Sequence, residues 1–164
     1  MNEQNLKELI EAGKIKGSER IQINNLLAAI SMAILVLIIG LEKIQFSPWA
    51  ITQLSFSIPL LVTSSLAYSK SAYRENSEYF MWDRLGWFAH TLGYSMILNS
   101  IFLILYFNFD HFVALMFLSI TIVLHILYSV IDYLLKKSRL LEKSTKLFFY
   151  VLIFFLGSIL PVLL

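Results

Sequence analysis

Residues Leu85–Phe109 read LGWFAHTLGYSMILNSIFLILYFNF and contain no Asp, Glu, Lys or Arg. An α-helix needs roughly 20 consecutive, predominantly apolar residues to cross the hydrocarbon core of a bilayer. Buried helices of soluble domains are usually shorter, so the length of this run favours a membrane span. The stretch therefore predicts a transmembrane helix.

One short motif inside this run suggests a different structure. Thr91-Leu92-Gly93-Tyr94 is similar to the core of a potassium-channel selectivity filter, which is a re-entrant loop. However, Ser95 stands where such a filter has a second glycine, and glycine adopts the alternating backbone conformations of a filter more cheaply than serine. The run is also unbroken, and a helix satisfies its backbone hydrogen bonds in lipid without help. We interpret the motif as helical, with Gly86 and Gly93 permitting close helix packing.

The composition of the whole chain supports a membrane protein. Its 164 residues are 58% hydrophobic and 15% charged, against roughly 25% charged in ordinary soluble domains. The chain has no cysteine, which excludes disulfides and cysteine-ligated zinc. The net charge of +2 gives no clustered basic face for nucleic acid. No metal-ligand pattern, phosphate-binding loop or nucleophile motif occurs, so we expect no catalytic residue, metal or cofactor.

The pattern of apolar runs predicts an all-α fold, a polytopic integral membrane helix bundle of about five transmembrane helices. The predicted helices span 21–41, 49–68, 85–109, 112–135 and 147–164, in one bundle over 21–164. Gly157 and Pro161 interrupt the fifth helix. The turn Asn108-Phe109-Asp110 is so short that the third and fourth helices are predicted to be antiparallel neighbours.

The N-terminal segment, residues 1–20, is predicted to be cytoplasmic and amphipathic. Asn5 followed by Glu8 resembles a capping box, and Leu6, Leu9 and Ile10 share one helix face. We expect a short helix that lies on the membrane surface and ends near Gly13. The alternative is a solvated tail.

The distribution of positive charge predicts the orientation of the chain. Twelve of the 13 Lys and Arg residues fall in the N-terminal segment and the second and fourth connections, and only Lys43 falls on the other side. Cytoplasmic flanks carry the excess of Lys and Arg. We therefore expect a cytoplasmic N-terminus and a C-terminus on the outer side.

Polar side chains at helical spacing form a predicted seam on the third and fourth helices. Its members are His90, Tyr94, Ser95, Asn99, Thr121, His125, Ser129 and Asp132. A thinner row of Gln53, Ser57 and Ser64 lies on the second helix. Ionisable residues at membrane depth are candidates for a proton or ion path. The alternative is hydrogen bonding between helices, with His125 bonded to Ser95 or Tyr94 and Asn99 bonded to Thr121.

Two cytoplasmic segments are predicted to contact lipid headgroups or a partner. The second connection carries aromatic residues suited to the membrane interface, and the fourth connection is strongly basic. The candidate residues are Tyr79, Phe80, Trp82, Lys136, Lys137, Arg139, Lys143 and Lys146. The expected partners are the bilayer, anionic inner-leaflet lipids, and a protein partner or a second copy of the chain at the cytoplasmic face.

The sequence favours a non-enzymatic membrane protein that acts as an adaptor, sensor or effector subunit in a larger assembly. The seam is neutral for most of its length, and no ring of charge marks an ion site. An oligomeric ion or proton channel or transporter is the alternative. A lipid-modifying enzyme is a third class, because His and Asp can perform acid–base chemistry near an interface.

Overall fold

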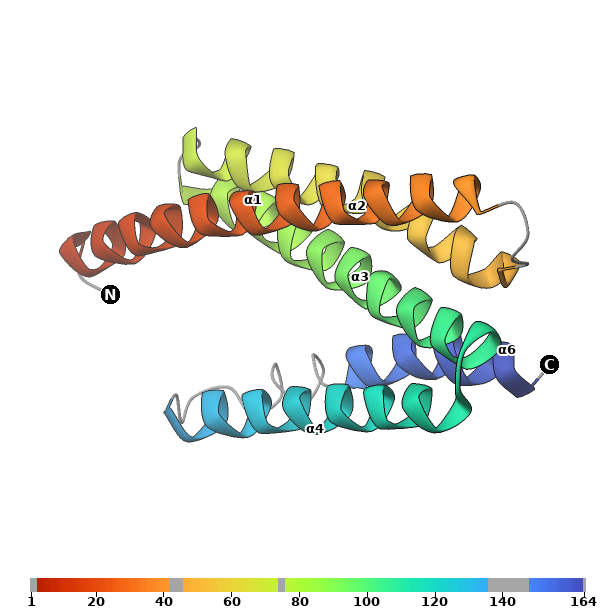
Figure 1. The fold of residues 1–164 in the computed structure, drawn as a ribbon. Coiled ribbons are helices and arrows are strands. Elements are labelled where there is room, and N and C mark those ends of the chain that lie inside the picture. The colour runs from red at the N-terminus through yellow and green to blue at the C-terminus, as the bar shows by residue number, and fades with distance from the viewer. Residues whose placement is uncertain (1–2, 42–45, 74–75, 136–147, 164) are drawn as a thin grey trace. The chain divides into compact units, whose positions relative to one another are not determined.

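The computed structural model describes residues 3–41, 46–73, 76–135 and 148–163, and these residues are almost entirely helical (Figure 1). The helices are α1 (Glu3–Gly40), α2 (Pro48–Tyr73), α3 (Asn76–Asn108) and α4 (His111–Leu135), followed by a C-terminal helix, Phe148–Leu163. Within the last helix lie the π-helical segment η1 (Phe155–Ile159) and α6 (Leu160–Leu163).

Four helices are long and apolar enough to cross a membrane. The candidate spans are Gly17–Gly40, Pro48–Ala72, Glu78–Asn108 and His111–Ile131. The all-helical prediction is therefore confirmed for the described residues, and the four candidate spans are consistent with a membrane helix bundle. The C-terminal helix is apolar but shorter than a full span over its described length.

The predicted short helix ending near Gly13 is wrong, because α1 continues unbroken from Glu3 to Gly40. A glycine inside a helix costs only about 1 kcal/mol relative to alanine, and the segment contains no proline. Gly13 and Gly17 therefore lie within one helix that also contains the first candidate span.

The predicted second connection is also largely helical, contrary to expectation. Helix α2 continues to Tyr73, and α3 begins at Asn76, nine residues before the predicted start. The predicted connection, residues 69–84, contains no Pro or Gly to stop a helix. Glu78 in the first turn of α3 interacts favourably with the positive end of the helix dipole. Its aromatic residues Phe80 and Trp82 therefore lie on α3.

The other helix limits follow from local capping signals. Pro48 opens α2, a position where its missing N–H costs nothing, and the Ser47 carbonyl accepts from the N–H of Ala50. The Asp110 carboxylate accepts a hydrogen bond from the Phe112 N–H at 2.9 Å, which caps α4. The predicted short turn between the third and fourth helices is confirmed.

The chain forms two compact units. The first unit comprises Met1–Leu37 and Ser55–Tyr94, and so contains most of α1, most of α2 and the first half of α3. Small residues bring these helices together. A Cβ on Gly86 would lie 2.9 Å from the Tyr68 ring, and one on Gly93 would lie 3.1 Å from the Leu61 side chain. The predicted role of both glycines in close packing is confirmed for the contact between α3 and α2.

The second unit comprises Ile38–Leu54 and Ser95–Leu164. Its apolar core is built from the start of α2, the second half of α3, α4 and the C-terminal helix. The buried members are Ala50, Phe102, Leu103, Ala114, Leu118 and Phe154. The core thus combines small side chains, Ala50 and Ala114, with the large rings of Phe102 and Phe154.

Candidate functional site

The first unit contains a buried chain of hydrogen bonds that joins its three helices. Asn24 of α1 donates from Nδ2 to the Ser64 hydroxyl of α2 at 2.8 Å. Ser64 donates to the backbone carbonyl of Gly86 on α3 at 2.7 Å. His90 Nδ1 lies 2.6 Å from Asn24 Oδ1. Asn24 and Ser64 are completely buried. We call these four residues the Asn24 chain.

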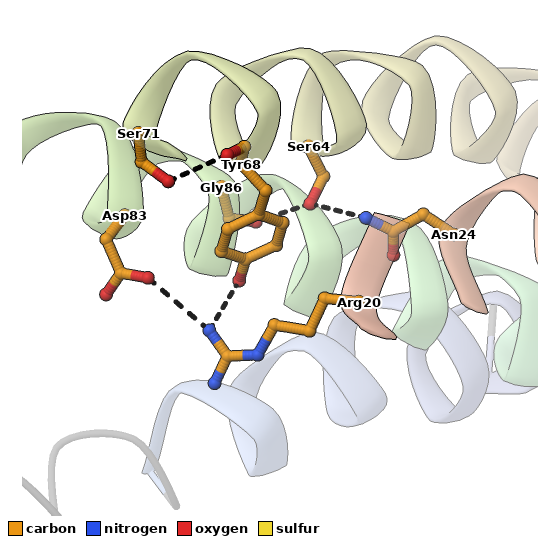
Figure 2. Close-up of polar contacts among 7 residues, drawn as sticks. All are labelled: Arg20, Asn24, Ser64, Tyr68, Ser71, Asp83 and Gly86. Carbon is orange, nitrogen blue, oxygen red and sulfur yellow. Dashed lines mark hydrogen bonds and ion pairs between the residues drawn. The ribbon is translucent and has the colours of Figure 1, made fainter. Parts of the chain in front are cut away.

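The local sequence explains how Ser64 reaches a backbone carbonyl of another helix. Gly86 has no side chain, and the buried Tyr68 ring occupies the place that a Cβ would take. The carbonyl already belongs to the helical ladder of α3, but a carbonyl oxygen has two lone pairs and accepts a second bond. Figure 2 shows Ser64 between Asn24 and Gly86, with the Tyr68 ring alongside.

Arg20 joins the same three helices one turn from the Asn24 chain. Its guanidinium donates to the Tyr68 hydroxyl at 3.0 Å and lies 3.6 Å from the Asp83 carboxylate (Figure 2). Both charged side chains are more than one third exposed, at 38% and 37%. Exposed ion pairs contribute only about 0–1 kcal/mol, so this pair adds little to the stability of the three-helix contact.

The second unit contains a separate buried polar cluster. Asn99 of α3 donates from Nδ2 to Gln53 Oε1 of α2 at 3.0 Å and to the Ile153 carbonyl at 3.3 Å. Ser158 donates to Asn99 Oδ1 at 2.6 Å, and Gln53 donates to the Gly157 carbonyl at 2.8 Å. Asn99 and Ser158 are completely buried, and Gln53 is 7% exposed. We call this set the Asn99 cluster.

The π-helical turn η1 and its glycine make room for the Asn99 cluster. A Cβ on Gly157 would lie 2.7 Å from Gln53 Oε1 and would also meet the Asn99 amide nitrogen. In a π-turn the backbone bonds run from residue i to i+5, which changes the direction of its carbonyls, and such turns occur often at functional sites. The Leu160 N–H accordingly bonds to the Phe155 carbonyl.

The predicted bond between Asn99 and Thr121 is wrong, and so is the predicted bond from His125 to Ser95, whose hydroxyl has no hydrogen-bond partner in the described part of the chain. Asn99 bonds Gln53 and Ser158, whereas the Thr121 hydroxyl donates to the Phe117 carbonyl of its own helix. His125 Nδ1 lies 2.8 Å from the Thr121 carbonyl. Its ring packs on two aromatic rings of the C-terminal helix, Tyr150 at 5.1 Å and Phe154 at 5.7 Å between centroids.

The remaining seam residues have varied surroundings. Ser129 donates to the His125 carbonyl, again within α4. The Tyr94 ring lies parallel to the His90 ring within 3°, at 6.1 Å between centroids. The Ser95 hydroxyl is buried and has no hydrogen-bond partner in the described part of the chain. Asp132 lies on the last turns of α4, and its side chain is outside the described part.

The predicted partner surface is partly corrected. Tyr79 is buried, so its side chain does not contribute to an accessible surface, whereas Phe80 is 49% exposed. Trp82 lies beneath the ammonium group of Lys70 at 4.8 Å, a cation–π contact between α3 and α2. The basic residues Lys136, Lys137, Arg139, Lys143 and Lys146 lie outside the described residues.

Sequence reasoning missed several residues that the structure brings together. Asn24, Arg20 and Ser158 were not singled out, and Gln53 and Ser64 were noted only as a thin row. The available signal was a polar residue in an apolar run: Asn24 and Ser158 both occur within such runs. Buried polar groups need partners, so each of these residues indicates a neighbouring helix with a polar group at its level.

The described residues contain no group of three or more His, Cys, Asp or Glu side chains that could hold a metal ion. Their polar groups can therefore orient helices, exchange hydrogen bonds and bind protons at histidine. Comparison with known proteins finds no family model, no curated protein and no solved structure that matches this chain.

Proposed function

We propose that this protein is a non-enzymatic integral membrane component that acts as an adaptor, sensor or effector in a larger assembly. One observation carries the proposal: the polar side chains of the Asn24 chain and the Asn99 cluster bond to each other or to backbone carbonyls. In the Asn24 chain and the Asn99 cluster these bonds hold three helices together. On α4, Thr121 and Ser129 turn back to their own helix. Such bonding supports packing rather than conduction.

The distribution of charge supports a cytoplasmic working face. The Lys and Arg residues favour a cytoplasmic N-terminus, which places the α2–α3 junction on the same side. Phe80 is exposed near that junction, and the basic segment 136–146 would be cytoplasmic as well. Each Lys or Arg near an anionic leaflet contributes about 1 kcal/mol of attraction. We propose that this face binds inner-leaflet lipid and docks a protein partner or a second copy.

The first test is ion flux in liposomes that contain the purified full chain. Proton and potassium flux between about pH 5 and pH 8, the range in which histidine titrates, is expected to equal that of empty liposomes. The His125→Ala variant is expected to behave identically, because His125 packs on aromatic rings. Flux that varies with pH and disappears in His125→Ala would reject the proposal in favour of an oligomeric proton or ion channel.

The second test concerns the docking face. A protein that remains bound after mild detergent extraction is expected to be lost with Phe80→Ala and retained with Phe88→Ala. Phe88 is the matched control, because it is exposed to a similar degree, 45%, two helical turns further along α3. Equal retention by both variants, or the absence of any bound protein, would contradict a partner surface at the α2–α3 junction.

A further inference from the structure

The Gly86 carbonyl, at one end of the Asn24 chain, fixes the direction of every hydrogen bond in it. The Gly86 carbonyl can only accept, so the single hydroxyl proton of Ser64 is committed to it. Ser64 can then only accept from Asn24, which turns the Asn24 NH₂ group toward Ser64 and the Asn24 carbonyl oxygen toward His90. A carbonyl oxygen is an acceptor, so His90 Nδ1 must carry a hydrogen.

A fixed hydrogen on Nδ1 determines the chemistry of the other ring nitrogen. In a neutral imidazole one nitrogen donates and the other holds a lone pair. With Nδ1–H donating to Asn24, the lone pair is on Nε2. We infer that His90 is a proton-binding site whose acceptor atom is Nε2 and whose tautomer is set by Asn24, Ser64 and the Gly86 carbonyl.

Proton binding at this site leaves the helix contacts intact. A hydronium ion transfers its proton to the Nε2 lone pair, which leaves water and converts imidazole to imidazolium, and no other side chain loses or gains a proton. The Nδ1–H bond to Asn24 is present in both forms. The three-helix connection therefore tolerates the charged and the neutral ring. The opposite tautomer would lack this property, since Nδ1 would then have to change from acceptor to donor.

The groups around His90 come from all three helices. Helix α1 brings Asn24 and the charged Arg20, which interacts electrostatically with His90. Helix α3 brings the parallel Tyr94 ring. Asp83, also on α3, is paired with Arg20. Helix α2 contributes Ser64, the neutral member of the Asn24 chain that bonds Asn24. The site does not depend on the proposed docking function, and it gives a membrane component a means of responding to acid.

The test is ¹⁵N NMR of the full chain, labelled on histidine and reconstituted in lipid bilayers. The three histidines are distinguished with His90→Gln, His111→Gln and His125→Gln. At alkaline pH the His90 signals are expected to show Nδ1–H and a bare Nε2. On acidification the Nε2 signal is expected to move by the full imidazole-to-imidazolium change, while Nδ1 stays protonated. An Nε2–H tautomer at alkaline pH, or an Nε2 that takes up no proton down to about pH 4, would overturn the inference.

A pair of serine variants tests whether the Asn24 chain sets the tautomer of His90. Ser64→Ala removes the group that orients the Asn24 amide, so His90 is expected to become a mixture of tautomers. Ser65→Ala is the matched control, because Ser65 bonds Asn25 Oδ1 and does not belong to the Asn24 chain. This variant is expected to leave the Nδ1–H form of His90 unchanged. A pure Nδ1–H form in folded Ser64→Ala would refute this mechanism. If Ser64→Ala fails to fold, the NMR titration of the native protein still shows whether His90 carries its hydrogen on Nδ1 and binds a proton at Nε2.

Discussion

Replacing Gly86 by alanine is expected to lower the free energy of unfolding by about 1–3 kcal/mol, the usual cost of an overpacked core. The new Cβ would lie 2.9–3.0 Å from three ring carbons of Tyr68. That ring cannot step aside freely, because Tyr68 is 1% exposed and its hydroxyl is bonded to Arg20. Separation of α3 from α2 relieves the clash but lengthens the bond from Ser64 to the Gly86 carbonyl.

The measurement is equilibrium unfolding in mixed micelles titrated with a denaturing detergent. Gly40→Ala is the control, since a Cβ there meets nothing within 4 Å and is expected to cause no loss of stability. The same titration run on Tyr68→Ala/Gly86→Ala should show that alanine at position 86 no longer adds to the cost once the ring is gone. A Gly86→Ala protein as stable as the native chain would mean that Gly86 does not set the spacing of α2 and α3.

The helical membrane architecture could be predicted because it depends on the length of apolar runs, which a sequence displays directly. The limits of α4 and the turn at 108–110 were correct to within one or two residues. The failures lie where aromatic and charged residues are mixed. The segment 69–84 has the composition of a membrane interface, but it contains no Pro or Gly to stop a helix. Accordingly α2 continues to Tyr73 and α3 begins at Asn76.

The polar contacts were much harder to predict, because periodicity gives the face of each residue but not the rotation of one helix against another. The helical spacing of the seam predicts a bond between Asn99 and Thr121. Asn99 instead bonds Gln53 and Ser158, which come from elements 46 residues before it and 59 residues after it in the chain. Thr121 has a local alternative, the carbonyl four residues earlier, which is always within reach of a helical threonine.

Replacing Asn99 by leucine is expected to lower the free energy of unfolding by about 2–4 kcal/mol. The change removes three hydrogen bonds and leaves Gln53 Oε1 and the Ser158 hydroxyl buried without their partner. Hydrogen exchange of the amides in Phe148–Leu163 is expected to accelerate, because Asn99 ties this helix to α3. Unfolding in mixed micelles and amide exchange measure the two effects.

Ser100→Ala is the control for Asn99→Leu. Ser100 is as deeply buried as its neighbour but donates only to the Met96 carbonyl of its own helix, so its loss is expected to cost less than about 1 kcal/mol and to leave exchange unchanged. If both variants were equally stable, the Asn99 cluster would have no special part in holding the C-terminal helix.

The triple variant Gln53→Leu/Asn99→Leu/Ser158→Ala distinguishes two contributions to the free energy of unfolding. One is the stabilisation by the hydrogen bonds, and the other is the cost of leaving a buried polar group without its partner. Removing all partners of a buried polar group together is often nearly neutral, whereas removing one leaves the others unpaired. We therefore expect the triple variant to be more stable than the sum of the single losses implies, by about 1–3 kcal/mol. Strict additivity would contradict a connected cluster, since independent bonds show no such coupling. Because Asn99 alone bonds both Gln53 and Ser158, the largest coupling is expected in the pairs that include it.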